Sequence, residues 1–199
     1  MLKKNLFTSA LALVAMFGFA NTLKAEDSTG RFGIHAGANF MSASAAGSNS
    51  DNGFIVGLNM ETPLIEGVLF LQPEFSLNRI GAENNSFGGA GTTRFTYLEV
   101  PVQLKLKGDF GAVELFGLAG PRVSLLINTS TDIAGFTVQD SDRKAYEFGL
   151  YFGGGIAFAM NDHSSLFFMG RYSLGLVDID ETNAEWKSKG FQLVAGLTF

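Results

Sequence analysis

The sequence predicts an all-β fold, an eight-stranded antiparallel transmembrane β-barrel with long extracellular loops and short periplasmic turns. Three observations support this prediction. Eight segments alternate apolar and polar residues with the period of a β-strand. The connections between these segments alternate between long and short. The face opposite the apolar one holds mainly Gly, Ser, Asn and Gln, which suit the narrow interior of a small barrel.

The N-terminal residues 1–25 are expected to be a secretory signal peptide. Lys3 and Lys4 precede an apolar run, and a polar stretch follows it. The apolar run of about 15 residues is too short for a membrane-spanning helix, which needs about 20. The small residues Gly18 and Ala20 fit the cleavage rule best, whereas the polar stretch that follows Ala25 favours cleavage after Ala25. We adopt the second site, so that residues 26–199 form one outer-membrane β-barrel domain.

Composition excludes several classes of function. The chain has no Cys, which removes disulfides, thiolate metal sites and a cysteine nucleophile. Its formal net charge is -5, with Lys and Arg scattered singly, so that nucleic acid is not an expected partner. The 25 Gly and 20 Phe suit closely approaching strands with aromatic outer faces. No motif calls for a cofactor or a metal ion.

The strands follow from the alternation taken in chain order. In the first, Phe32, Ile34 and Phe40 alternate with His35 and Asn39. An even number of strands lets the first and last pair antiparallel and close the sheet. The eight strands are expected over residues 31–40, 53–62, 69–79, 97–107, 113–125, 146–158, 165–176 and 190–199.

The connections support the same topology. Long polar stretches follow strands one, three, five and seven, and short ones follow strands two, four and six. Long loops at one end and tight turns at the other are typical of outer-membrane barrels. Pro73, Pro101 and Pro121 interrupt three strands, and since proline lacks a ladder donor we expect bulges or local irregularity there.

The polar face decides which side of the sheet is inside. A water-facing outer surface would carry Lys and Glu densely, whereas this face has one or two charges per strand. We therefore expect the polar face to line the lumen, where charges of both signs form a hydrogen-bonded plug. The residues of this lumen network are Glu61, Glu74, Glu99, Lys105, Glu114, Arg122, Glu147 and Arg171.

Three further groups have a chemical and a structural interpretation. Residues 162–164 are Asp, His and Ser, but consecutive residues in a tight turn point apart and cannot form a catalytic triad. His35 faces the lumen, where an interior hydrogen bond is expected and a pH-sensitive gate is the alternative. The acidic stretch 178–181 lacks the central Gly and distal Glu of a calcium loop, and a solvated loop is expected.

The strands contain the motifs "GIHAGANF", "FLQPEFSLNRIG", "TYLEVPVQLKLK", "LFGLAGPRVSLLI", "EFGLYFGGGIAF" and "RYSLGLVDI". These motifs resemble those of the PorT-like outer-membrane β-barrel family of Bacteroidota. The resemblance covers nearly the whole chain after the signal peptide. It implies an eight-stranded barrel without a catalytic signature, in a family whose founding member is linked to secretion. It also implies that Phe199 is the terminal aromatic residue recognised by the barrel-assembly machinery.

These observations favour a non-enzymatic integral protein of the cell outer membrane. Its expected partners are outer-membrane lipid, the barrel-assembly machinery during biogenesis, and unidentified partners in envelope assembly, secretion or surface contact. One alternative is an outer-membrane enzyme that modifies lipid or peptide, which a Ser, His or Asp cluster at the loop rim would favour. The other is a soluble periplasmic barrel that binds a ligand with its apolar face inward, which solubility without detergent would reveal.

Overall fold

The structure, a computed structural model, describes residues 30–44, 49–84, 91–133, 136–138, 146–176 and 187–199. The expected signal peptide therefore lies outside the described residues. Among those residues, no helix is long and apolar enough to cross a membrane. The strands are β1 (Arg31–Ser44), β2 (Asn49–Ile65), β3 (Leu69–Asn84), β4 (Gly91–Asp109), β5 (Val113–Ile133), β6 (Phe136–Val138), β7 (Tyr146–Ala159), β8 (Ser165–Gly175) and β9 (Lys187–Thr198).

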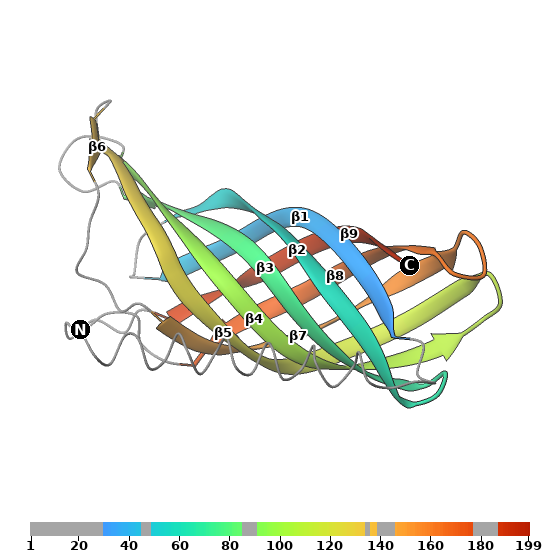
Figure 1. The fold of residues 1–199 in the computed structure, drawn as a ribbon. Coiled ribbons are helices and arrows are strands. Elements are labelled where there is room, and N and C mark those ends of the chain that lie inside the picture. Colours follow the sequence, from blue (N-terminus) through green and yellow to red (C-terminus); the bar gives the residue numbers. More distant parts are fainter. Residues whose placement is uncertain (1–29, 45–48, 85–90, 134–135, 139–145, 177–186) are drawn as a thin grey trace.

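Eight of these strands form a closed antiparallel barrel, which confirms the predicted fold class (Figure 1). They follow one another in the order β4-β3-β2-β1-β9-β8-β7-β5, and β4 also pairs with β5, which closes the ring. The short β6 pairs with the far end of β5. β1 pairs with the C-terminal end of the chain up to its last residue, because Phe32 and Phe199 exchange backbone hydrogen bonds of 2.8 and 2.7 Å.

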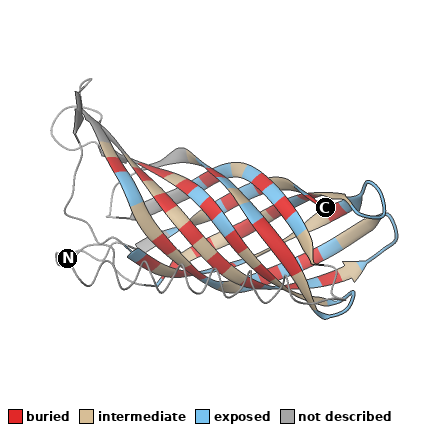
Figure 2. Ribbon diagram, viewed as in Figure 1, coloured by how far each residue is buried: buried red, intermediate tan, exposed pale blue. Residues whose placement is uncertain are grey.

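Burial alternates along the strands, with apolar side chains outward and polar ones inward (Figure 2). On β1, Ile34 is 45% exposed, whereas its neighbour His35 is 5% exposed. β4 follows the same rule with exposed Leu104 and buried Gln103. This is the orientation of a membrane barrel, since a water-soluble one keeps its apolar face inside. Met60 of β2 departs from this rule, because it is apolar and alternates with inward-facing Asn59 and Glu61, yet it is buried.

The strands extend further than predicted at the end of the barrel that carries the long connections, here called the loop end. Residues 41–52 are predicted as a loop, yet β1 continues to Ser44 and β2 begins at Asn49. β5 likewise reaches Ile133, and with β6 it projects beyond the barrel (Figure 1). These polar segments lack clear alternation, but their backbone groups still pair with neighbouring strands.

The opposite end, here called the turn end, has the short connections that the sequence predicts. They comprise residues 66–68, 110–112 and 160–164. Gly67 and Gly111 have positive φ angles of 72° and 86°, which side chains with a Cβ rarely adopt. The glycines thus permit the tight turns that set the antiparallel register.

Pro73, Pro101 and Pro121 interrupt pairing without shifting its register. The β3–β4 ladder is broken between the Pro73–Val102 and Ser76–Glu99 pairs, where Pro101 lies, and resumes in the same register. The β4–β5 ladder is broken in the same way beside Pro121. The predicted irregularity at these three prolines is therefore a local loss of pairing. Register shifts lie at residues 51–54 of β2, at residues 63–65 of β2 beside Pro63, and at residues 96–97 of β4.

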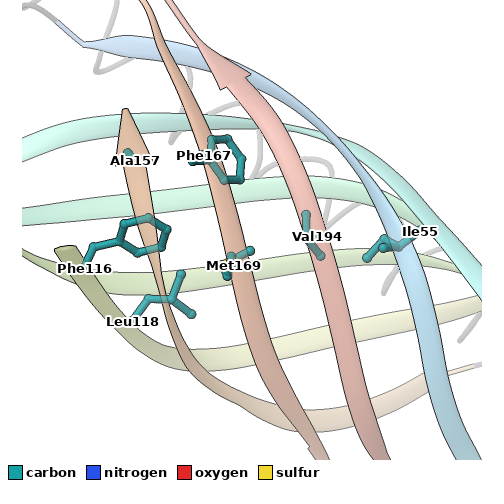
Figure 3. Close-up of a cluster of buried hydrophobic side chains, with 7 residues drawn as sticks. All are labelled: Ile55, Phe116, Leu118, Ala157, Phe167, Met169 and Val194. Atoms are coloured by element: carbon teal, nitrogen blue, oxygen red, sulfur yellow. The ribbon is translucent and has the colours of Figure 1, made fainter. Parts of the chain in front are cut away.

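The interior is not polar throughout, which the alternation does not predict. Apolar side chains of β2, β5, β7, β8 and β9 meet inside the barrel (Figure 3). We call this group the apolar cluster; its members are Ile55, Phe116, Leu118, Ala157, Phe167, Met169 and Val194. A smaller group nearer the loop end contains Ile80, Phe95 and Tyr97. Where these two groups lie, apolar residues therefore occupy both the inner and the outer face of the sheet.

Candidate functional site in the barrel lumen

The structure places all eight residues of the expected lumen network on the inner face. Seven are buried, and the side chain of Glu114 is 27% exposed. They do not form one network but two groups at different depths. The central network contains Glu74, Glu99, Arg122, Glu147 and Arg171. The rim network, near the turn end, contains Glu61, Lys105, Lys107 and Glu114.

Arg171 of β8 crosses the lumen to Glu74 of β3. Its two terminal nitrogens donate to the two carboxylate oxygens at 2.8 and 2.9 Å. Its Nε donates to Oε1 of Gln192 at 2.6 Å, and the His35 ring nitrogen Nε2 lies 3.2 Å from Glu74 Oε1. A bidentate arginine–carboxylate pair is the strongest ion-pair geometry available to protein side chains. It ties strands that are far apart around the ring.

Arg122 of β5 holds the second pair of carboxylates. One terminal nitrogen donates to Glu99 Oε1 at 3.2 Å, and the other donates to Glu147. Glu99 also accepts hydrogen bonds from Ser124 Oγ at 3.0 Å and Asn78 Nδ2 at 3.1 Å. These neutral donors matter because the central network has three carboxylates and two guanidinium groups. Hydrogen bonds replace the water that a buried carboxylate loses.

Tyr151 joins the two halves of the central network. Its hydroxyl donates to Glu99 Oε2 at 2.5 Å and accepts from Gln192 Nε2 at 3.4 Å. Its ring lies between two guanidinium groups, with the Cζ atoms of Arg171 and Arg122 at 4.3 and 5.3 Å from the ring centroid. This fully buried side chain therefore combines hydrogen bonds with cation–π contacts.

Glycines of β7 make room for the two arginines. A Cβ on Gly149 would lie 2.8 Å from Arg122 Nε, and one on Gly153 would lie 2.7 Å from Arg171 Cβ. Real Cβ atoms do not approach other atoms so closely. The glycine-rich stretch of β7 thus permits the arginine side chains to lie against the barrel wall.

The rim network centres on Glu61 of β2. Lys105 and Lys107 Nζ donate to its two carboxylate oxygens at 2.5 and 2.6 Å, and Lys107 also lies 3.2 Å from Glu114. Lys105 Nζ is 4.0 Å from the centroid of the Phe116 ring. The rim network opens toward a depression of about 370 Å³ at the turn end, which Glu114 lines.

On β5, two members of the apolar cluster lie between the two networks. Along the inner face of β5, Glu114 is followed by Phe116 and Leu118 of the cluster and then by Arg122. Along this strand, ion pairs, apolar side chains and ion pairs therefore follow one another. On β4, by contrast, Gln103 follows Lys105 toward the loop end and donates to Glu74 Oε2 at 3.4 Å. Side chains fill the interior of a barrel of this size, and this order supports a closed structure.

The other candidate groups supply no reactive constellation. Residues 162–164 lie in the β7–β8 turn, with Asp162 and His163 exposed, and the His163 backbone N–H donates to Asn161 Oδ1 at 2.9 Å. Within the described residues, no group of three or more His, Asp or Glu side chains could hold a metal ion. The stretch 178–181 lies outside those residues. The recognition role of Phe199 stays a prediction.

Lys107 and Tyr151 also face the lumen, but the network expected from the sequence includes neither. Lys107 could have been found from its position two residues after Lys105, since that spacing puts both side chains on one face. The role of Tyr151 has no local signal. Its partners come from strands distant in sequence, and only barrel closure brings them together.

Comparison with known families places the chain among membrane barrels. The family model described as outer membrane protein beta-barrel domain matches residues 19–181. The chain belongs to this family. It is therefore an outer-membrane β-barrel protein, as the outward apolar face and the inward charges also indicate. No curated protein sequence matches the chain.

Several solved structures of outer-membrane barrels have the same fold as this chain. Neisserial surface protein A (NspA) is 18% identical, with a TM-score of 0.53 over 87% of this chain and 98% of its own. A major outer membrane protein from Thermus thermophilus is 12% identical, with a TM-score of 0.52 over 86% and 100%. OprG from Pseudomonas aeruginosa is 14% identical, with a TM-score of 0.51 over 86% and 97%. Likeness at these identities concerns the fold alone.

Proposed function

We propose that this protein is a non-enzymatic structural barrel whose lumen is closed by its own side chains. The observation that carries the proposal is the ion pair of Arg171 with Glu74, which crosses the lumen between β8 and β3. Met169 and Phe167 of the apolar cluster follow Arg171 on β8 toward the turn end and provide a second barrier. A barrel closed in this way anchors its loop end at the cell surface and does not provide a path for solutes.

The resemblance to the PorT-like family favours a more specific biological role. In that family the founding member is linked to secretion, so that this chain would assist secretion, envelope assembly or surface contact. The support is the set of strand motifs that includes "TYLEVPVQLKLK" and "EFGLYFGGGIAF". Lipid of the outer membrane would surround the apolar face, and the barrel-assembly machinery would act during biogenesis.

The absence of a reactive constellation in the described lumen supports the non-enzymatic proposal. A nucleophile, a base and an orienting group must lie within hydrogen-bond reach of one another. The central network instead combines carboxylates with guanidinium groups, which hold one another in fixed positions. No described observation favours the lipid- or peptide-modifying alternative.

Two measurements on the full-length mature protein test this proposal. In planar bilayers, the purified barrel is expected to give no steady current, and in detergent it is expected to leave lipid and peptide substrates intact. A steady conductance would contradict the closed lumen, and substrate turnover would contradict the structural role. Mild cross-linking in cells followed by purification is expected to recover envelope proteins, which would identify the partner.

A further inference from the structure

The depression at the turn end is lined by side chains of both charges. Its volume is about 370 Å³, and its lining includes the guanidinium group of Arg31 and the carboxylates of Asp109, Glu114 and Asp162. The hydroxyl group of Ser165 also lines it. Sites for small molecules have volumes of about 300–1,000 Å³. The depression is therefore large enough for a small polar ligand.

The opposite charges come from different walls of the depression. Arg31 begins β1 and Glu114 lies near the start of β5, and in the ring β9, β8 and β7 lie between these two strands. Asp162 belongs to the β7–β8 turn. Among the described residues, the Arg31 side chain has one polar contact, from Nη2 to Ser165 Oγ at 3.0 Å, and no carboxylate pairs with it. A cation and anions thus face one depression without neutralising one another.

Two of the three carboxylates keep most of their capacity to accept hydrogen bonds. Glu114 lies 3.2 Å from Lys107 Nζ, which compensates its charge. Asp109 accepts a hydrogen bond of 2.7 Å from the backbone N–H of Gly111. Asp162 is exposed and has no partner among the described residues. An ionised carboxylate has about four acceptor positions, so that Asp109 and Asp162 can accept further hydrogen bonds.

Backbone hydrogen bonds fix the walls of the depression before any ligand binds. In the β7–β8 turn, the Met160 N–H donates to the Ser164 carbonyl at 2.9 Å, and the Ser164 N–H donates to the Asn161 carbonyl at 3.4 Å. The Ala159 N–H donates to the Ala112 carbonyl at 3.3 Å, which joins this turn to the β4–β5 turn. Walls that are already held in place lose little conformational entropy on binding.

The two kinds of charge select the chemical class of the ligand. A simple anion would be attracted by Arg31 but repelled by Asp109 and Asp162, and a simple cation would be repelled by Arg31. Within the described part of the chain, no group of three His, Asp or Glu side chains could hold a metal ion. A zwitterion is complementary to both walls, because its anionic group accepts from the guanidinium group and its ammonium group donates to the carboxylates.

We propose that the depression at the turn end binds a small zwitterion whose ammonium and anionic groups are a few bonds apart, such as a phosphoethanolamine group. Arg31 binds the phosphate, and Asp109 and Asp162 bind the ammonium group. A free solute and the headgroup of a phospholipid both carry this chemistry. In the predicted topology the site faces the periplasm. The inference goes beyond the structural role proposed above and does not depend on whether the lumen is closed.

Calorimetric titration of the mature barrel in a non-ionic maltoside detergent tests the proposal with three probes. Glycerophosphoethanolamine is expected to bind about tenfold more tightly than dimethyl phosphate or ethanolamine, which each carry only one of its charged groups. Arg31→Gln and Asp162→Asn are each expected to weaken its binding about fivefold, as for partly exposed charge contacts. The matched control Glu66→Gln, in the β2–β3 turn outside the depression, is expected to bind it as the wild type does.

Three outcomes would overturn the proposal, provided that the variants fold, which gel mobility with and without heating shows. The first is equal binding of the three probes. The second is wild-type binding by both Arg31→Gln and Asp162→Asn, and either variant serves if the other does not fold. The third is a loss in Glu66→Gln as large as theirs, because the effect would then be one of general surface charge.

Two further arms define the site and the source of the zwitterion. Glu26 and Asp27 precede Arg31 in the chain and lie outside the described residues. The variant Glu26→Gln/Asp27→Asn is expected to bind as the wild type does, and a loss equal to that of Arg31→Gln would contradict the assigned site. Native mass spectrometry from vesicles of phosphatidylethanolamine and phosphatidylglycerol distinguishes the sources. Selective retention of phosphatidylethanolamine that Arg31→Gln abolishes supports a lipid headgroup, and probe binding without such retention supports a free solute.

Discussion

The central network and the rim network use similar charges in different surroundings. Arg122 and Arg171 are at most 1% exposed, and the carboxylates they bind are equally enclosed. In the rim network, Glu114 is 27% exposed and lies beside the depression at the turn end. Along β5, Phe116 and Leu118 of the apolar cluster lie between the buried ion pairs and this opening.

This difference determines how much each network contributes to stability. A charge left without its partner in a sealed interior cannot be hydrated, so that breaking a buried pair is strongly destabilising. Breaking an exposed pair lowers the stability little, because water replaces the missing partner. The central network should therefore determine whether the barrel folds as a single structure, and the outer part of the rim network should contribute little.

The largest effect is expected from removing a central arginine. Replacing Arg171 with Met leaves Glu74 without its bidentate partner and should lower the free energy of unfolding by about 3–5 kcal/mol. Arg122→Met should have a similar effect through Glu99 and Glu147. Urea-dependent folding into vesicles measures both changes. Wild-type midpoints would mean that water reaches the central network.

The next prediction compares two positions on the outer face, one at the depth of the central network and one at the depth of the rim network. Val102 lies beside Gln103 at the level of the central network, and Leu106 lies between the two rim lysines. Arg in place of Val102 should cost roughly 2–4 kcal/mol near the membrane midplane, whereas Leu106→Arg should cost about 0–1 kcal/mol near the interface. Folding into vesicles distinguishes them. Equal penalties, with folded protein in plain buffer, would instead support a soluble barrel.

A smaller effect is expected from the hydroxyl of Tyr151. The variant Tyr151→Phe keeps the ring between the two guanidinium groups but removes one of the donors to Glu99. The expected loss is about 1–3 kcal/mol, as for a buried polar group that loses one hydrogen bond. The same urea titration measures it, with Tyr172→Phe on the outer face as the control. A loss no larger than that of the control would exclude Tyr151 as the link between the two halves.

The alternation of the sequence predicted the eight strands and the inward position of every charge in the network. Alternation is a local property of each strand, and it can be recognised without knowing which strands lie next to it. It failed where both faces are apolar, as at Phe167, Phe168 and Met169, since consecutive apolar residues have no period. The inner apolar cluster was therefore not predicted.

The pairing of the charges could not be predicted from local patterns. Arg171 and Glu74 are 97 residues apart in sequence, and they meet because the closed barrel places β8 opposite β3. Which carboxylate faces which arginine depends on the stagger of the strands around the ring. The extension of β1, β2 and β5 into polar segments was missed for a related reason, because backbone pairing continues where side-chain alternation ends.

The most direct test of the difference between the networks is a pair of double-mutant cycles measured by urea-dependent folding into vesicles. One cycle combines Arg171→Met with Glu74→Gln, and the other combines Lys107→Met with Glu114→Gln. The coupling energy is expected to be about 2–3 kcal/mol for the central pair and below about 1 kcal/mol for the rim pair. Equal coupling energies in the two cycles would contradict the account, because the partly exposed rim pair would then be as well shielded from water as the buried central pair.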